Sequence, residues 1–216
     1  MQHAPTADVQ QAPTIDAGHE TSTGIDNRKL LMWLFLASEC LFFGGLIGTY
    51  LLYRNSGVAP PCPQDCVFDG VTYHGLFDIP FTSISTFVLL MSSVTMVLAL
   101  AAIQRNDRRG LRIWLLATAM LGMTFLAGQA FEFTEFYNEG LSLNTNLFGT
   151  TFFVLTGFHG AHVSVGVLML LSMYIVSQRN GWTKEHSLNV ELLGLYWHFV
   201  DIVWIVIFTL VYLIQT

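Results

Sequence analysis

Residues 140–178 read GLSLNTNLFGTTFFVLTGFHGAHVSVGVLMLLSMYIVSQ and contain no Asp, Glu, Lys or Arg. A predominantly apolar stretch of about 18 residues is long enough to cross a bilayer as a helix. Four further stretches, 30–53, 81–103, 113–131 and 193–216, carry at most one charge each. The pattern predicts an all-α fold, a polytopic membrane protein whose bundle of five transmembrane helices occupies residues 30–53, 80–103, 111–136, 147–177 and 191–214.

The composition of the whole chain agrees with a membrane protein. Of its 216 residues, 11% are charged and 53% are hydrophobic, and the mean hydropathy is +0.53. A soluble domain usually carries about 25% charged residues. The composition therefore excludes a soluble enzyme, a nucleic-acid binder and a secreted disulfide scaffold.

The basic residues predict how the chain is oriented. Five spans place eight of the nine Lys and Arg residues on one side, namely Arg28, Lys29, Arg105, Arg108, Arg109, Arg112, Arg179 and Lys184. Only Arg54 falls on the other side. The positive-inside rule then predicts a cytoplasmic N-terminus and an external C-terminus. This topology also puts Glu132 and Glu135 at the external end of the third span, where water is expected to reach them.

The segments outside the spans predict one tail and one long loop. Residues 1–27 are polar and lack an Arg-rich presequence, so we expect a disordered cytoplasmic tail ahead of a transmembrane domain at 28–216. The external loop at roughly 55–79 contains Cys62 and Cys66. On the oxidising side these cysteines can form a short-loop disulfide. Two free thiols and a copper site are the alternatives, whereas two cysteines alone cannot complete a tetrahedral zinc site.

Ionisable side chains within the spans are the candidate functional residues, because each is costly in hydrocarbon unless it is paired. They are Glu39 in the first span, His159 and His162 in the fourth, and His198 and Asp201 in the fifth. His159 and His162 lie on adjoining faces of one helix. One interpretation is that they bind a metal or haem together with His198. The interpretation we favour is that the histidines are hydrogen-bond partners that make the two carboxylates tolerable.

Small and aromatic residues predict where the helices make contacts. Gly44 and Gly48 form a Gly-x-x-x-Gly pair, which permits close approach of another helix. We expect this pair, with Trp197 and Trp204, to lie against another subunit, another helix of this chain or ordered lipid. For the two tryptophans, ordinary core packing is the alternative.

Four segments of the chain resemble motifs of one known family. LYWHFVDIVW at 195–204 is similar to the closing-helix motif of cytochrome c oxidase subunit III, and TFFVLTGFHGAH at 151–162 resembles that family's penultimate-helix motif. Ser38-Glu39, followed by Phe42-Phe43-Gly44, resembles its Ser-Glu-…-Phe-Phe segment. Gln129 and Glu132 fall where the family has a Gln-Ala-x-Glu pattern. The matches follow the family's order and cover spans one, three, four and five.

The resemblance implies a non-redox accessory subunit III of a proton-pumping haem–copper terminal oxidase in aerobic respiration, which reduces dioxygen with electrons from cytochrome c. Members of the family pack against subunit I in a complex with subunit II, stabilise subunit I, support its proton uptake and bind phospholipid between their helices. The haems and copper belong to the partner subunits, so no cofactor, metal or catalytic residue is expected in this chain.

The resemblance also assigns roles to individual residues. Glu39 corresponds to the family's buried, carbodiimide-reactive glutamate. Other motif positions, with structural or lipid-associated roles, are matched by His159, His162, Trp197, His198 and Asp201.

The chain departs from the longer members of the family, which have seven helices, because it begins at what would be the third. Five-helix members occur among bacterial cytochrome c oxidases, quinol oxidases and relatives linked to nitric oxide reduction. A tail without a presequence fits a multi-pass protein of the bacterial plasma membrane. Within the family, the alternative is subunit III of a quinol oxidase or of a relative linked to nitric oxide reduction. Outside it, the alternatives are a stand-alone proton-coupled transporter using Glu39 and Asp201 and a membrane cytochrome using the three histidines.

Overall fold

The computed structural model describes residues 26–54, 66–68, 71–73, 78–141, 147–180 and 182–214. Five long helices account for most of these residues: α1 (Asn27–Tyr53), α2 (Ile79–Gln104), α3 (Arg108–Asn138), α4 (Leu147–Asn180) and α5 (Ser187–Phe208). Within the described ranges, all five are long and apolar enough to cross a membrane. The predicted all-α, five-helix fold is confirmed.

Short elements complete the chain. The 3-10 turn η1 (Lys184–His186) leads into α5, and the π-helical turn η2 (Thr209–Leu213) continues it. Strands β1 (Cys66–Phe68) and β2 (Val71–Tyr73) form an antiparallel hairpin between α1 and α2, which the apolar pattern did not predict. Cys62 and the side chain of Cys66 lie outside the described residues, as does nearly all of the tail at 1–27. The disulfide and the disordered tail stay predictions.

Aspartates determine where the first three helices begin. Asp26, Asp78 and Asp107 precede α1, α2 and α3, and each carboxylate accepts hydrogen bonds of 2.8–3.2 Å from backbone N–H groups of the first turn. These N–H groups have no acceptor within the helix itself, so the caps stabilise the helix start. The caps explain why α1 and α3 begin about a turn ahead of the predicted apolar spans.

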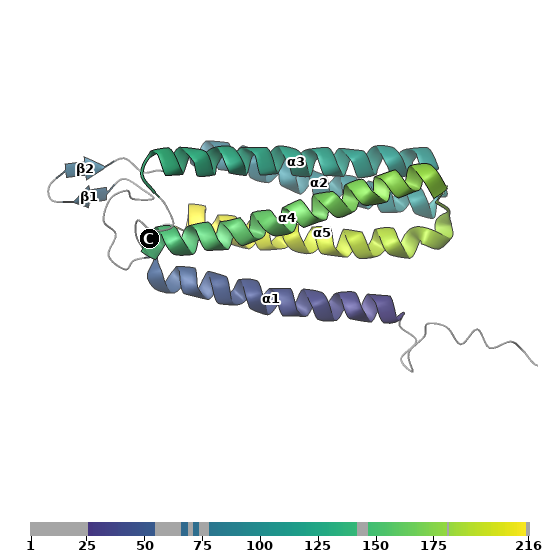
Figure 1. Cartoon of the computed structure of the whole chain (residues 1–216), viewed down its shortest axis with the longest axis horizontal. Helices are drawn as coiled ribbons and strands as arrows, with labels where there is room; N and C mark the ends of the chain where they lie inside the picture. The colour runs from purple at the N-terminus through teal and green to yellow at the C-terminus, as the bar shows by residue number, and fades with distance from the viewer. Residues whose placement is uncertain are drawn as a thin grey trace, which may run out of the picture.

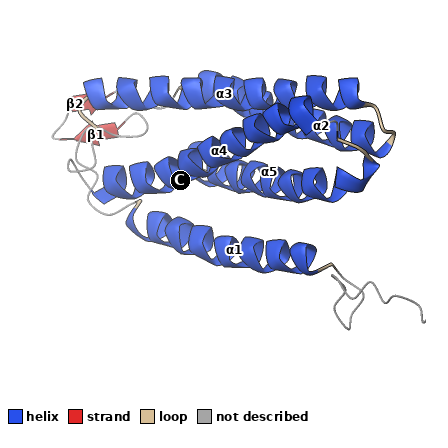
Figure 2. Ribbon diagram, turned by 45° about the vertical axis from the view of Figure 1, so that its right-hand side comes forward, coloured by secondary structure: helices blue, strands red, loops and turns tan. Residues whose placement is uncertain are grey.

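The five helices do not pack equally closely. Helices α2 and α3 pack along their length, α4 lies against α3, and α5 lies against α2 and α4. Helix α1 stands at the edge of the bundle, where it contacts α4 and α5 (Figures 1 and 2). In the most apolar stretch of each helix, 11% of the α1 residues are buried, compared with 50% of the α5 residues. Helix α1 is therefore the span that the rest of the chain covers least, and α5 is the most enclosed.

The up-and-down arrangement gathers the basic residues at one end of the bundle. The start of α1, the turn between α2 and α3 and the connection between α4 and α5 all lie at the same end (Figure 1). All eight residues assigned to the cytoplasmic side belong to these three segments, and Arg54 follows the opposite end of α1. That this end faces the cytoplasm stays a prediction.

The core lies between α2, α3, α4 and α5 and centres on the indole of Trp197. A Cβ atom added to Gly122 of α3 or to Gly166 of α4 would lie 2.7 Å from this ring. The two glycines therefore form a notch that admits the indole. Any larger residue at either position would push the ring out.

Candidate functional site

The central feature of the candidate site is a pair formed by Glu39 of α1 and His162 of α4. Glu39 Oε2 lies 3.3 Å from His162 Nε2, and the two side chains are 18% and 19% exposed. The other ring nitrogen, Nδ1, lies 2.7 Å from the carbonyl oxygen of Phe158, so it carries a hydrogen and donates to that carbonyl. Because Nδ1 is engaged by that carbonyl, Nε2 is the ring nitrogen that faces the Glu39 carboxyl. The structure thus joins Glu39 to one of its two proposed histidine partners.

Aromatic side chains enclose this pair. The ring of Phe43 lies 5.0 Å from that of His162. Tyr196 of α5 donates from its hydroxyl to the His162 carbonyl oxygen at 3.0 Å, and its ring stacks on Phe35 at 6.3 Å. Helix α5 therefore positions both the turn that carries His162 and the turn that precedes Glu39. In such weakly polar surroundings a hydrogen bond is electrostatically stronger than in water.

His159 has different surroundings from His162, although only two residues separate them in α4. Its side chain is fully buried and stacks on Trp204, with 4.8 Å between ring centroids, and the edge of Phe125 packs against it at 6.0 Å. Neither ring nitrogen has a hydrogen-bond partner among the described residues. His159 therefore does not act as a partner of either intramembrane carboxyl group.

His198 and Asp201 belong to the contact between α5 and α2. His198 Nδ1 lies 2.7 Å from the Ser93 hydroxyl. The Asp201 carboxyl is 3% exposed and lies near the same hydroxyl. Neither carboxyl oxygen meets hydrogen-bond geometry with a described residue. Asp201 is thus a buried group of the bundle interior, separate from the Glu39 pair.

The distribution of these groups bears on the alternative functions. The three histidines contact different partners, namely a carboxyl group, an indole and a serine hydroxyl. Within the part of the chain that the structure describes, no three His, Cys, Asp or Glu side chains converge as a metal site requires. The geometry gives no support to joint metal or haem ligation by the histidines. It gives none to a transport site that combines Glu39 with Asp201.

Of the neighbours expected for Trp197 and Trp204, the structure shows other helices of this chain. Their side chains are 0% and 1% exposed. The indole N–H of Trp197 donates to Ser92 Oγ at 2.9 Å, and that of Trp204 donates to Thr86 Oγ1 at 3.0 Å. A buried indole N–H needs an acceptor, and in a bilayer only the protein can supply it. The hydroxyls of α2 do so, and core packing is the correct alternative.

Gly44 and Gly48 face away from the other helices. No described atom beyond α1 lies within 4 Å of the place where a Cβ would stand on either glycine. We expected this pair to contact another subunit, another helix of this chain or ordered lipid. Contact with another helix of this chain is therefore excluded, and the other two neighbours remain.

Glu132 is a buried carboxyl group at the end of the bundle opposite the basic residues, and the sequence analysis did not predict its burial. Glu132 of α3 is 4% exposed and accepts hydrogen bonds from Thr82 Oγ1 at 2.7 Å and from the Tyr212 hydroxyl at 3.1 Å. The expectation that water reaches Glu132 is wrong, whereas Glu135 is exposed. Gln129, nearly one turn earlier, is also buried. Gln129 and Glu132 lie three positions apart and therefore on one face of α3. This pattern in the sequence could have indicated that the face turns inward.

Comparison with known proteins connects the chain to respiratory oxidases. A family model described as cytochrome c oxidase subunit III matches residues 3–216. A cytochrome c oxidase subunit 3 from Synechocystis is 39% identical over 210 residues, which cover 97% of this chain and 85% of that protein. A quinol oxidase subunit 3 from Bacillus spizizenii is 36% identical over 195 residues, or 90% of each chain. A probable quinol oxidase subunit 3 from Staphylococcus saprophyticus is 35% identical over 203 residues, which cover 91% of this chain and 96% of that protein.

Proposed function

The chain belongs to the cytochrome c oxidase subunit III family, and from this premise we propose that it is the non-redox accessory subunit III of a proton-pumping haem–copper terminal oxidase. The family match along nearly the whole chain is the observation that carries the proposal. As a member of this family the chain is a multi-pass plasma-membrane protein and a partner of other oxidase subunits. We assign those partners as subunits I and II.

The proposed role is to stabilise subunit I and to support its proton uptake. The haems and copper of the partner subunits supply the redox chemistry of dioxygen reduction, and this chain carries none of them. Its own contribution comes from the Glu39–His162 pair, which lies at the partly exposed junction of α1 and α4. A second contribution is the outer face of α1, which meets no other helix of the chain.

Cytochrome c is the electron donor that we propose for the complex, and quinol is the alternative. The relative with the highest identity of the three described above, at 39%, is named as a cytochrome c oxidase subunit, whereas the other two are named as a quinol oxidase subunit and a probable quinol oxidase subunit. The donor is recognised by the other subunits. Only the assembled complex therefore distinguishes the two cases.

Bound phospholipid is a further part of the proposal. Helix α1 stands apart from α2 and α3 and buries little of its surface within the chain (Figure 2). In a bilayer, lipid chains contact a surface of this kind. Lipid held between α1 and its neighbours would stabilise the position of α1.

Purification of the affinity-tagged chain in a mild detergent tests this function. We expect haem-containing subunits to co-purify, and the complex to consume oxygen with reduced cytochrome c. Consumption with quinol alone would establish the quinol oxidase alternative. Recovery of the chain without any haem protein would contradict membership of an oxidase complex, and a Soret band from the isolated chain would contradict the non-redox role.

A further inference from the structure

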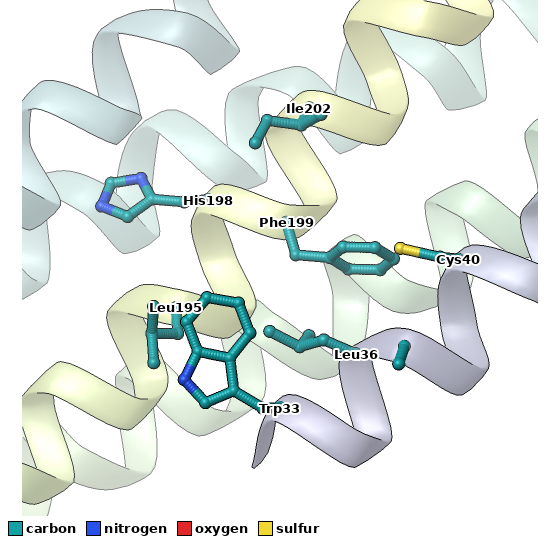
Figure 3. Close-up of a pocket in the computed structure, with 8 residues that line it drawn as sticks. Trp33, Leu36, Cys40, Leu195, His198, Phe199 and Ile202 are labelled. Carbon is teal, nitrogen blue, oxygen red and sulfur yellow. The ribbon is translucent and has the colours of Figure 1, made fainter. Parts of the chain in front are cut away.

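His198 brings a polar group to the surface of the bundle near the middle of the membrane. It lies close to the midpoint of α5, and its partner Ser93 lies close to the midpoint of α2. Figure 3 shows the imidazole ring pointing away from α1, and its Nδ1 lies 2.7 Å from the Ser93 hydroxyl. Because His198 is only partly buried, its other ring nitrogen, Nε2, is the atom to account for.

The hydrogen bond at Nδ1 determines what Nε2 offers to a neighbour. Among the described residues the Ser93 hydroxyl has no other acceptor in hydrogen-bond geometry, so it donates to Nδ1. An imidazole that accepts at Nδ1 carries its hydrogen on Nε2, which is then a donor. Nε2 has no partner within the described part of the chain, which also leaves this atom open at the surface. The chain thus presents an unpaired N–H at mid-membrane depth.

The core of a bilayer has no partner for this N–H. Acyl chains carry no acceptor, and a polar group left unpaired in hydrocarbon is costly. A single water molecule needs several polar partners to be held in such a place. The exposed neighbours one turn from Ser93 and from His198 are apolar, namely Val97 at 53% and Ile202 at 59% exposure. The N–H therefore needs an acceptor oxygen from another protein.

The surface around His198 has the composition of a contact between transmembrane helices. Helices α1 and α2 lie on different sides of α5 and do not pack against each other in the described part of the chain, so α5 is open between them. Here His198, Ile202 and Ile205 follow one another at helical spacing, and the two isoleucines are 59% and 41% exposed. In lipid, helices associate through apolar packing around a few hydrogen bonds. A single N–H among apolar side chains fits this pattern.

We propose that His198, Ile202 and Ile205 of α5, with Val97 of α2, bind a transmembrane helix of another oxidase subunit, and that His198 Nε2 donates to an oxygen of that helix. This set of residues is called the His198 surface below. The partner helix carries a carboxyl, amide or hydroxyl oxygen near its middle, with apolar residues around it. The inference rests on the proposed function, which makes the chain part of an oxidase complex, and it names the surface and the chemistry of one contact.

Site-specific photocrosslinking in the intact complex tests the proposal. The photoreactive residue p-benzoylphenylalanine replaces Ile202, and in a matched variant it replaces Met120, which is 53% exposed near the middle of α3. After illumination in the membrane, mass spectrometry identifies the molecule joined to each probe and the peptide involved. We expect the probe at 202 to join a transmembrane segment of another oxidase subunit several-fold more often than the probe at 120.

Variants at two positions test the hydrogen bond itself. His198→Leu removes the donor and should lower the ratio of this chain to haem in the purified complex several-fold. His198→Gln keeps an N–H group at the end of the side chain and should preserve most of this ratio. Ser93→Ala removes the internal partner of Nδ1 but leaves Nε2 in place, so its ratio should equal that of the wild type.

Three results would overturn the proposal. The first is a probe at 202 that joins only lipid, or joins oxidase subunits no more often than the probe at 120. The second is a wild-type ratio in His198→Leu, and the third is an equal loss in His198→Leu and Ser93→Ala, which would assign the effect to the internal bond. If His198→Leu fails to insert into the membrane, the crosslinking result decides alone. The wild-type chain co-purifies with haem proteins in each case, so the surface can fail while the proposed function stands.

Discussion

At the scale of single residues, the Glu39–His162 pair explains how a carboxyl group is tolerated within a membrane span. His162 donates from Nδ1 to a backbone carbonyl, which leaves Nε2 facing the Glu39 carboxyl at 3.3 Å. A buried polar group that loses its partner costs far more than the net worth of the hydrogen bond. Variants that keep the donor should therefore behave differently from variants that delete it.

Substitution of Glu39 tests this pairing. In Glu39→Gln the amide can donate to His162 Nε2, so assembly and stability should be preserved. Glu39→Ala removes the partner of His162 and should destabilise the complex by about 1–3 kcal/mol. Thermal unfolding of the purified complex measures the difference, with Glu135→Ala as an exposed-carboxylate control.

Oxygen reduction should survive both Glu39 substitutions, because the metals lie in other subunits. Equal destabilisation by Gln and Ala would show that a polar partner at position 39 does not stabilise His162. Immediate loss of oxygen reduction in a fully assembled Glu39→Gln complex would make Glu39 an obligatory proton carrier and would refute the supporting role.

Glu132 gives a second test at this scale. Its Oε1 accepts hydrogen bonds from Thr82 and Tyr212, and the amide oxygen of Glu132→Gln can accept the same two. Glu132→Ala removes the shared acceptor from a buried position and should cost about 1–3 kcal/mol of unfolding free energy. The comparison of the two variants in a denaturation experiment is the check. An Ala variant as stable as the Gln variant would mean that these bonds contribute nothing net.

At the scale of the helices, α5 holds the bundle together. Its indoles at 197 and 204 donate to hydroxyls of α2, and Tyr196 donates to α4. Its closest fit to the other helices is at Gly122 and Gly166, where backbone rather than side chains faces Trp197. In lipid, such close packing replaces the hydrophobic driving force between helices.

Enlarging the glycine notch residues should disrupt this fit. A Cβ in Gly122→Ala or Gly166→Ala would stand 2.7 Å from a rigid ring, and such overpacking typically costs about 1–3 kcal/mol. Gly44→Ala, where no described atom beyond α1 lies within 4 Å, should leave stability unchanged. Tryptophan fluorescence during thermal unfolding compares the three variants. An unchanged midpoint for both notch variants would disprove the close fit.

The helices themselves were predictable from sequence, but their orientations within the bundle were only partly so. Hydropathy locates spans because each needs a long apolar stretch. It does not show which side faces inward, because lipid tails are as apolar as a protein core. For this reason the neighbours of Trp197 and Trp204 were left open between another subunit, lipid and the bundle itself, and Glu132 was assigned to the water interface. Glu39 and His162 were associated correctly, because a charge in hydrocarbon requires a partner.

At the scale of the whole molecule, α1 is the helix that the rest of the chain leaves most exposed. Few of its residues are buried, and its glycines at 44 and 48 meet no other helix. A surface with open glycines permits close approach of a partner's backbone. The complex, rather than this chain alone, then completes the surroundings of α1.

Gly44→Leu and Gly48→Leu test this surface without disturbing the chain itself, because the space beside both glycines is open. We expect both variants to be retained less well in the oxidase during purification. Ala127→Leu, on the exposed side of α3, should be retained as in the wild type. Quantification of the chain relative to haem in the purified complex is the measurement. Unchanged ratios for both glycine variants would show that this face meets only mobile lipid.

The most direct test of the accessory role compares oxygen consumption by the purified oxidase with and without this chain. If the chain stabilises subunit I and supports proton uptake, the depleted complex keeps its haem spectrum and reduces oxygen in the first turnovers. Its activity then declines faster than that of the complete complex, and adding the chain back restores its lifetime. Loss of the haem spectrum, or absence of oxygen reduction from the first turnover, would contradict the account.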